Sequence, residues 1–154
     1  MKDLSKRAKE IIEKIQYITI ASVTENGMPW NSPVFSTYDE NFNFYWGTHS
    51  DSQKAKNIRA NSNVFLVIYD STVPSGTGEG VYIKATARQI SDPGEVRRVF
   101  ELLKDRHATS FWDFAAVSEE GPIRLFKAVP QQAWMNDDGR KNGHYIDIRT
   151  EITL

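Results

Sequence analysis

Residues 48–61 read THSDSQKAKNIRAN, a polar stretch between two segments that are typical of β-strands. The aromatic run FNFYWG (42–47) precedes it, and the apolar run NVFLVIYD (63–70) follows it. Ser52 is a candidate N-cap, and Lys54 stands in the first turn of the helix that Ser52 would begin. The sequence therefore predicts a strand, a polar loop, a short helix and a further strand in this order.

The polar stretch has two interpretations. Free backbone N–H groups at a helix start, together with the hydroxyls of Thr48 and Ser52 and the ammonium of Lys54, are suited to bind an anion such as phosphate. Alternatively, the segment is a solvated, capped helix whose lysines serve solubility. The spacing of the residues alone does not decide between an anion site and a solvated helix.

Helical and strand patterns continue along the rest of the chain. Residues 4–15 predict an amphipathic helix, because their apolar residues recur every three or four positions. Asn26-Gly27 predicts a hairpin turn, and a second long helix is expected from Pro93, with Asp92 as its N-cap. Strands are expected at 17–23, 30–38, 42–47, 63–70, 81–90, 122–129, 131–136 and 144–149, with a loop at 71–80, an irregular or helical segment at 106–121 and a turn at 137–143.

Composition limits the class of protein. The 154 residues (1–154) predict one domain, and the formal net charge of −1 does not favour a nucleic-acid-binding surface. There is no cysteine, which excludes disulfides and zinc–thiolate sites, and the three histidines are too scattered to predict a metal site. The first residues have no apolar signal core and no run is long enough to span a bilayer, so a cytoplasmic protein without a membrane partner is expected.

Taken in order, these segments resemble the pyridoxamine 5′-phosphate oxidase-like family of flavin-binding split barrels, from the first helix to about residue 136. The most specific part is similar to the family pattern T-x-x-x-S-x-K-x-x-N, continued by a hydrophobic residue, a second Asn and an apolar strand. The matching positions are Thr48, Ser52, Lys54, Asn57, Ile58, Asn61 and Val64. The resemblance implies a mainly β fold: a split β-barrel of six to eight antiparallel strands with flanking α-helices.

The resemblance also implies an FMN cofactor bound at the interface of a homodimer. In this analogy Ser52 and Lys54 contact the FMN phosphate. Gln53 stands where many members carry a second basic residue. Gly47 and Thr48 would lie along the ribityl chain or the phosphate.

The ring of the flavin is expected beside the strand 30–38. By the resemblance, this strand runs under the isoalloxazine edge and offers backbone groups to its polar rim, while Trp134 approaches from the partner subunit. The strand residues concerned are Ser32, Pro33, Val34, Phe35 and Ser36. Pro33 predicts an edge position or a bulge, because proline has no N–H for a sheet.

The chain departs from pyridoxamine 5′-phosphate oxidase itself in three places. Ser32 occupies the position of an arginine near the FMN phosphate, and Thr37 occupies that of a lysine that contacts the substrate phosphate. The C-terminal R-x-H is missing, because Arg124-Leu125-Phe126 has no histidine. These departures argue against the vitamin as substrate.

The predicted function is that of an FMN-dependent oxidoreductase with an unassigned substrate. The flavin would carry the redox chemistry, so no catalytic acid or base needs to stand out in the sequence, and none is assigned. Arg106, His107 and Trp112 are candidates for the substrate side. The alternatives are a non-catalytic flavin-binding or flavin-sensing protein and a relative that uses deazaflavin F420 instead of FMN.

Overall fold

The computed structural model describes residues 2–107 and 112–154. Its helices are α1 (Leu4–Lys14), α2 (Gln53–Ala60), α3 (Pro93–Arg106) and α4 (Phe114–Val117). Its strands are β1 (Tyr17–Val23), β2 (Pro29–Tyr38), β3 (Phe44–His49), β4 (Asn63–Tyr69), β5 (Gly80–Gln89), β6 (Ile123–Lys141) and β7 (His144–Ile152).

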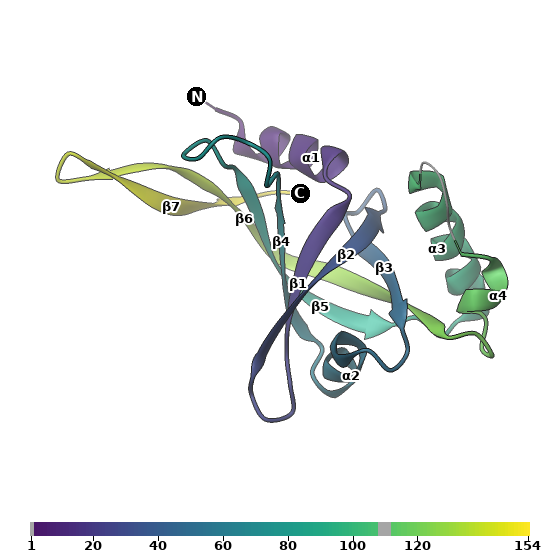
Figure 1. The fold of residues 1–154 in the computed structure, drawn as a ribbon. Coiled ribbons are helices and arrows are strands. Elements are labelled where there is room, and N and C mark those ends of the chain that lie inside the picture. Colours follow the sequence, from purple (N-terminus) through teal and green to yellow (C-terminus); the bar gives the residue numbers. More distant parts are fainter. Residues whose placement is uncertain (1, 108–111) are drawn as a thin grey trace.

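Within these residues the seven strands form one antiparallel sheet in the order β3-β2-β1-β4-β5-β6-β7. β3 also pairs with β6, from Phe44 opposite Ala128 to His49 opposite Ile123. This pairing closes six strands into a ring, and β7 lies outside it, as Figure 1 shows. The fold is therefore a split β-barrel with flanking helices, and the predicted fold class is confirmed.

The barrel and α3 enclose two separate hydrophobic cores. The main core fills the barrel beneath α1 and contains Ile20, Leu66 and Trp46, which are fully buried. The second core lies between α3 and the outer side of β3 and β6, where Phe100 and Leu103 pack against Tyr45 and Leu125. Asp92 caps α3 as predicted, since its carboxylate accepts a hydrogen bond from the Glu95 backbone N–H at 2.8 Å. The second core fixes α3 at the side of the barrel (Figure 1).

The C-terminal strands differ from the prediction. The expected strands 122–129 and 131–136 belong to a single strand, because β6 runs unbroken from Ile123 to Lys141. The predicted break between them is therefore wrong, and the turn expected at 137–143 begins only after Lys141. At Pro130 the pairing register with β5 shifts between Lys84 and Ala85, and this irregularity keeps β6 continuous although proline has no N–H for a sheet. The turn comes at Asn142-Gly143, where φ is 52° and 80°, so that β6 and β7 form a ribbon that extends away from the barrel (Figure 1).

Other segment boundaries differ less. The strand expected at 42–47 begins at Phe44, because Phe42 has φ of 56° and belongs to the turn. The last strand continues to Ile152 rather than ending at 149. The segment 106–121 contains α4, and its residues 108–111 lie outside the described part of the chain.

The turn between β2 and β3 is organised by Asp39. Its carboxylate accepts hydrogen bonds from the backbone N–H groups of Asn41 and Asn43, from the Asn43 amide and, at 2.7 Å, from the Tyr45 hydroxyl. Partial burial alone would raise the pKa of Asp39, but the hydrogen bonds from Asn43 and Tyr45 outweigh it, so the pKa lies below its usual value. The ionised carboxylate therefore stabilises this turn.

Asp39→Ala is expected to lower the free energy of unfolding by about 1–3 kcal/mol at neutral pH, because several donors lose a charged acceptor. The pKa of Asp39 is lower in the folded than in the unfolded chain, so its contribution is full above the unfolded-state pKa. It disappears as the pH falls through the folded-state pKa. Urea unfolding at neutral and acid pH measures this change, with the exposed neighbour Glu40→Ala as control. An equal loss at both pH values would contradict the role of the charge.

Candidate functional site

A hollow of about 460 Å³ lies between β2, the start of α2 and the end of α3. It brings together five of the residues that the sequence predicted, Pro33, Val34, Phe35, Gly47 and Lys54. The other lining residues are Tyr17, Leu103, His107 and Trp112. We call this space the Lys54 hollow.

The β2 side of the hollow is an open strand edge. Pairing between β2 and β3 begins only at Ser36, so that the stretch containing Pro33 pairs with β1 alone. Pro33 therefore lies at a strand edge, where its missing N–H leaves no hydrogen bond to a second neighbouring strand unmade, as predicted. The open edge leaves backbone groups of β2 available to a ligand in the hollow.

One end of the hollow is built to receive an anion. The Lys54 ammonium donates to the Thr48 hydroxyl at 3.1 Å, and the Thr48 and Ser52 hydroxyls are 3.1 Å apart. Ser52 is the N-cap of α2 as predicted, and its hydroxyl accepts from the Ala55 backbone N–H at 3.3 Å. The Thr48 and Ser52 hydroxyls, the Lys54 ammonium and the start of α2 therefore lie close together.

Lys54 is a partly buried cation. Burial lowers its pKa, because the surrounding protein solvates the ammonium less well than water does. Among the ion pairs of the described residues, none joins Lys54 to a carboxylate, and its hydrogen bond goes to a neutral hydroxyl. A bound anion would pair with the positive charge of the Lys54 ammonium.

The other end of the hollow is aromatic. The ring centroids of Phe35 and His107 are 3.8 Å apart. The Tyr17 ring contacts the Phe35 ring edge-on, with 5.9 Å between the centroids. Burial lowers the pKa of His107, which favours its neutral imidazole at neutral pH. A cationic end and an aromatic lining suit a ligand that joins a phosphate to a flat ring. The sequence interpretation named neither Tyr17 nor Leu103, because only the packing of β1 and α3 against β2 brings them here.

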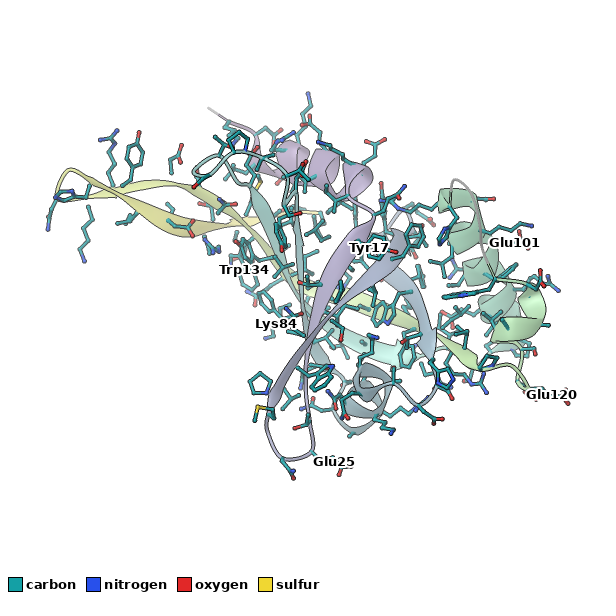
Figure 2. The ribbon with its side chains drawn as sticks, in the orientation of Figure 1. Tyr17, Glu25, Lys84, Glu101, Glu120 and Trp134 are labelled. Carbon is teal, nitrogen blue, oxygen red and sulfur yellow. The ribbon has the colours of Figure 1, made fainter. Side chains whose placement is uncertain are left out.

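Other predicted residues lie outside the hollow. Ser32 and Ser36 are buried and are not among the lining residues, and the Ser36 hydroxyl donates to the Gln16 carbonyl at 3.5 Å. Trp134 stacks on Phe65 at 6.2 Å, and Figure 2 shows it well separated from Tyr17. In its own chain Trp134 therefore does not reach the Lys54 hollow.

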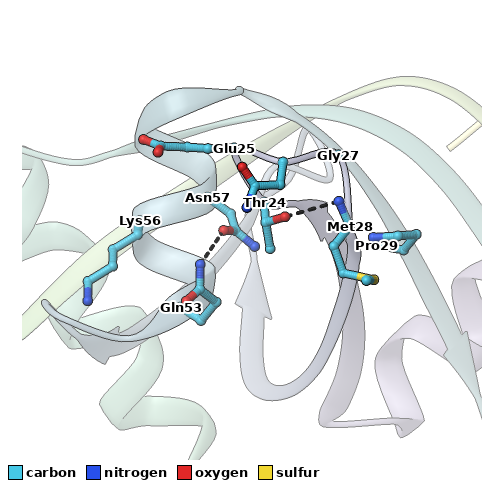
Figure 3. A pocket seen from close by; sticks show the side chains of 9 residues that line it. Thr24, Glu25, Gly27, Met28, Pro29, Gln53, Lys56 and Asn57 are labelled. Carbon is cyan, nitrogen blue, oxygen red and sulfur yellow. Dashed lines mark hydrogen bonds between the residues drawn. The ribbon is translucent and has the colours of Figure 1, made fainter.

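Gln53 faces a second hollow of about 800 Å³, between the β1–β2 turn and α2 (Figure 3). Its amide donates to Asn57 at 2.8 Å, and the Asn57 amide donates to the buried Ser22 hydroxyl at 3.0 Å. This chain of hydrogen bonds ties α2 to β1. Gln53 thus stands one residue from Lys54 but on the other side of the helix start.

Arg106 lies at the end of α3, where the sequence suggested a contact with the substrate. Its guanidinium donates to the carbonyl oxygens at the end of α1, those of Ile12, Glu13 and Ile15, at 3.1–3.2 Å. It also lies over the Tyr38 ring, 5.2 Å from the centroid. Arg106 therefore caps α1 and holds it to α3, whereas His107 does line the hollow.

Two negative findings apply to the residues that the structure describes. Histidines and carboxylates do not gather there in any group that could hold a metal ion. A helix with the length and apolar character needed to cross a membrane is also not found in that part of the chain.

Solved structures of low sequence identity share this fold. HutZ, the heme storage protein of Vibrio cholerae, is 16% identical with a TM-score of 0.71, over 85% of this chain and 92% of that chain. An F420 reductase is 17% identical with a TM-score of 0.63, over 81% and 94%. A Listeria innocua protein provisionally assigned as a pyridoxamine 5′-phosphate oxidase is 20% identical with a TM-score of 0.62, over 84% and 95%.

At these identities the structural likeness shows the fold alone. A comparison with curated protein sequences gives no match. The sequence profile of the family described as pyridoxamine 5′-phosphate oxidase, however, matches residues 4–137, from the start of α1 into the second half of β6. The profile spans most of the sequence, and the chain therefore belongs to the pyridoxamine 5′-phosphate oxidase family.

Proposed function

We propose that the chain binds FMN in the Lys54 hollow and serves as a flavin-dependent oxidoreductase for a small substrate. The observation that carries this proposal is the partly buried Lys54 ammonium, which shares Thr48 with the N-cap hydroxyl of Ser52 and lines a hollow together with several aromatic side chains. The FMN phosphate would pair with the Lys54 ammonium, and the isoalloxazine ring would pack against the aromatic side chains of the hollow.

When bound, the flavin would supply the redox chemistry of hydride transfer. The protein binds the phosphate through Lys54, Thr48 and Ser52 and thereby fixes the position of the cofactor. The open backbone edge at Pro33 and Val34 faces the polar rim of the ring. Neutral His107 and its neighbour Phe35 restrict water at the far end of the hollow.

The protein should bind FMN more tightly than riboflavin. Removing the phosphate deletes charge-assisted hydrogen bonds, each worth roughly 1.5–3 kcal/mol, so a loss of at least about tenfold in affinity is expected. Quenching of flavin fluorescence in parallel titrations with FMN and riboflavin measures the ratio. Equal affinities for the two would overturn the assignment of the phosphate to Lys54.

The same titrations include F420 and heme, because structural relatives carry those names. F420 also joins a flat ring to a phosphate and would use the same two ends of the hollow. Heme carries propionate carboxylates in place of a phosphate, so its binding is distinguished from that of FMN by the visible spectrum rather than by dependence on Lys54. A visible spectrum with each ligand, followed by a redox assay of the loaded protein, separates an oxidoreductase from a flavin-binding protein without turnover.

The second part of the proposal is a homodimer. The outer faces of β4, β5 and β6 carry a cluster of aromatic side chains, in which Phe65 stacks on Trp134 and is 37% exposed. Tyr82 lies opposite Trp134 in the sheet, and Tyr69, at the end of β4, is 48% exposed. A second copy packed on this cluster would cover it and bring Trp134 toward the partner's flavin site.

A dimer is therefore expected in solution at micromolar concentration. Sedimentation velocity of the FMN-loaded protein measures its mass. Trp134→Lys should shift the population toward monomer, because a charge would be buried in the interface. The matched control is Tyr145→Lys, an exposed aromatic residue on the β6–β7 ribbon. A wild-type monomer that binds FMN would contradict the shared site.

A further inference from the structure

Trp112 packs directly on the backbone of Gly47. A Cβ atom at position 47 would lie 2.4 Å from Cζ3 and 2.6 Å from Cη2 of the Trp112 indole. Such approaches are far inside van der Waals contact, so the indole fits here only because residue 47 has no side chain. Position 47 in β3 is thus matched to a tryptophan that is distant in the sequence.

This contact stands beside the anion-binding residues. Gly47 precedes Thr48, whose hydroxyl receives the Lys54 hydrogen bond. Both Gly47 and Trp112 line the Lys54 hollow, and the indole keeps 38% of its surface exposed. The indole therefore borders the hollow near its phosphate end.

The end of α3 continues the wall that Trp112 begins. Leu103 and His107 line the same hollow, and the His107 ring contacts Phe35 at 3.8 Å. This wall comes from the part of the chain between β5 and β6, whereas the phosphate-binding residues come from β3 and α2. The Lys54 hollow is thus enclosed from two sides by one chain.

We propose that Trp112 is a positioning residue for the flavin: its indole packs on bound FMN beside the phosphate end, and Gly47 is the small residue that lets it do so. This inference rests on the proposed function. Packing of a rigid aromatic side chain on the ligand adds contact area and excludes water from the Lys54–phosphate contact.

The first test compares Trp112→Ala with Trp112→Phe. FMN affinity should fall about tenfold in the alanine variant and by no more than about threefold in the phenylalanine variant, which keeps an aromatic surface. FMN should also quench tryptophan fluorescence less in both variants than in wild type. Trp30→Phe, which changes an exposed tryptophan outside the hollow, is the control and should leave the affinity unchanged.

The second test uses Gly47→Ala, whose Cβ forces the indole off β3. This variant should weaken FMN binding about as much as Trp112→Ala, and the double variant should bind no worse than either single one, because both remove the same contact. Additive losses in the double variant would overturn the proposal. Thermal unfolding of each apo-protein shows whether the variant is folded; Trp112→Ala, which only shortens a partly exposed side chain, carries the test if Gly47→Ala does not fold.

The outcomes separate this inference from the proposed function. If wild type binds FMN and Trp112→Ala binds it as well or better, the indole does not position the flavin and this inference is wrong while the proposed function stands. If wild type does not bind FMN at all, the proposed function fails and this inference fails with it.

Discussion

Pyridoxamine 5′-phosphate should be oxidised by the FMN-loaded protein a few orders of magnitude less efficiently than by a typical enzyme acting on its own substrate. A phosphorylated substrate needs a cationic clamp of its own, apart from the one that holds the FMN phosphate. Thr37 stands where the family resemblance places a lysine, and it is buried, with 5% of its surface exposed. It therefore offers neither charge nor access to a substrate phosphate.

Arg106 and Arg124, which could otherwise contribute to a replacement clamp, already donate to backbone carbonyl oxygens. Arg106 donates to three carbonyl oxygens at the end of α1. Arg124 donates to the carbonyl oxygens of the turn before β6, including those of Gly121 at 2.7 Å and Glu119 at 2.8 Å. Losing two charged contacts would cost on the order of 3–6 kcal/mol in transition-state binding, which accounts for the expected loss of efficiency.

An aerobic assay that follows the formation of pyridoxal 5′-phosphate measures this activity. The expected specificity constant is well below the range of about 10⁴ M⁻¹s⁻¹ and above that is common for enzymes. A value within that range would show that the substrate phosphate has a clamp, and Arg106→Ala would then be the first variant to make. A loss of activity in that variant must be compared with its unfolding curve, since Arg106 also caps α1.

Lys54→Ala should weaken FMN binding by roughly 10- to 100-fold, which is the range for one charge-assisted hydrogen bond to a phosphate. Riboflavin affinity should hardly change, because riboflavin has no phosphate for the ammonium to bind. The apo-protein should unfold at nearly the same temperature as wild type, since within the described residues the Lys54 side chain donates to the neutral Thr48 hydroxyl and is not part of either core.

Lys56→Ala is the matched control for Lys54→Ala. It removes an ammonium from the same helix, but Lys56 is exposed and borders the second hollow beside the β1–β2 turn (Figure 3). FMN affinity should therefore stay near the wild-type value. If Lys54→Ala lowers the unfolding temperature sharply and leaves the FMN affinity unchanged, Lys54 is a structural residue and the anion site is not at the start of α2.

The sequence by itself determined the parts of this protein that local patterns encode. The polar stretch 48–61 predicted a capped helix between two strands, and the structure has Ser52 at the N-cap and Lys54 in the first turn. The N-cap of α3 at Asp92 and the edge position of Pro33, which pairs with β1 but not with β3, also followed from residue type alone. These features depend on contacts within a few residues, so the sequence contains their cause.

Only the tertiary structure decided how the candidate site is enclosed. Gln53 and Lys54 are neighbours in the sequence, yet at the start of α2 their side chains line different hollows. Residues 122–129 and 131–136 were expected to form two strands, but a register shift against the distant strand β5 keeps β6 continuous through Pro130. Trp112 packs on Gly47, although the two residues are far apart in the sequence. Such contacts join residues far apart in the chain, and their geometry depends on the packing of the whole barrel rather than on any local pattern.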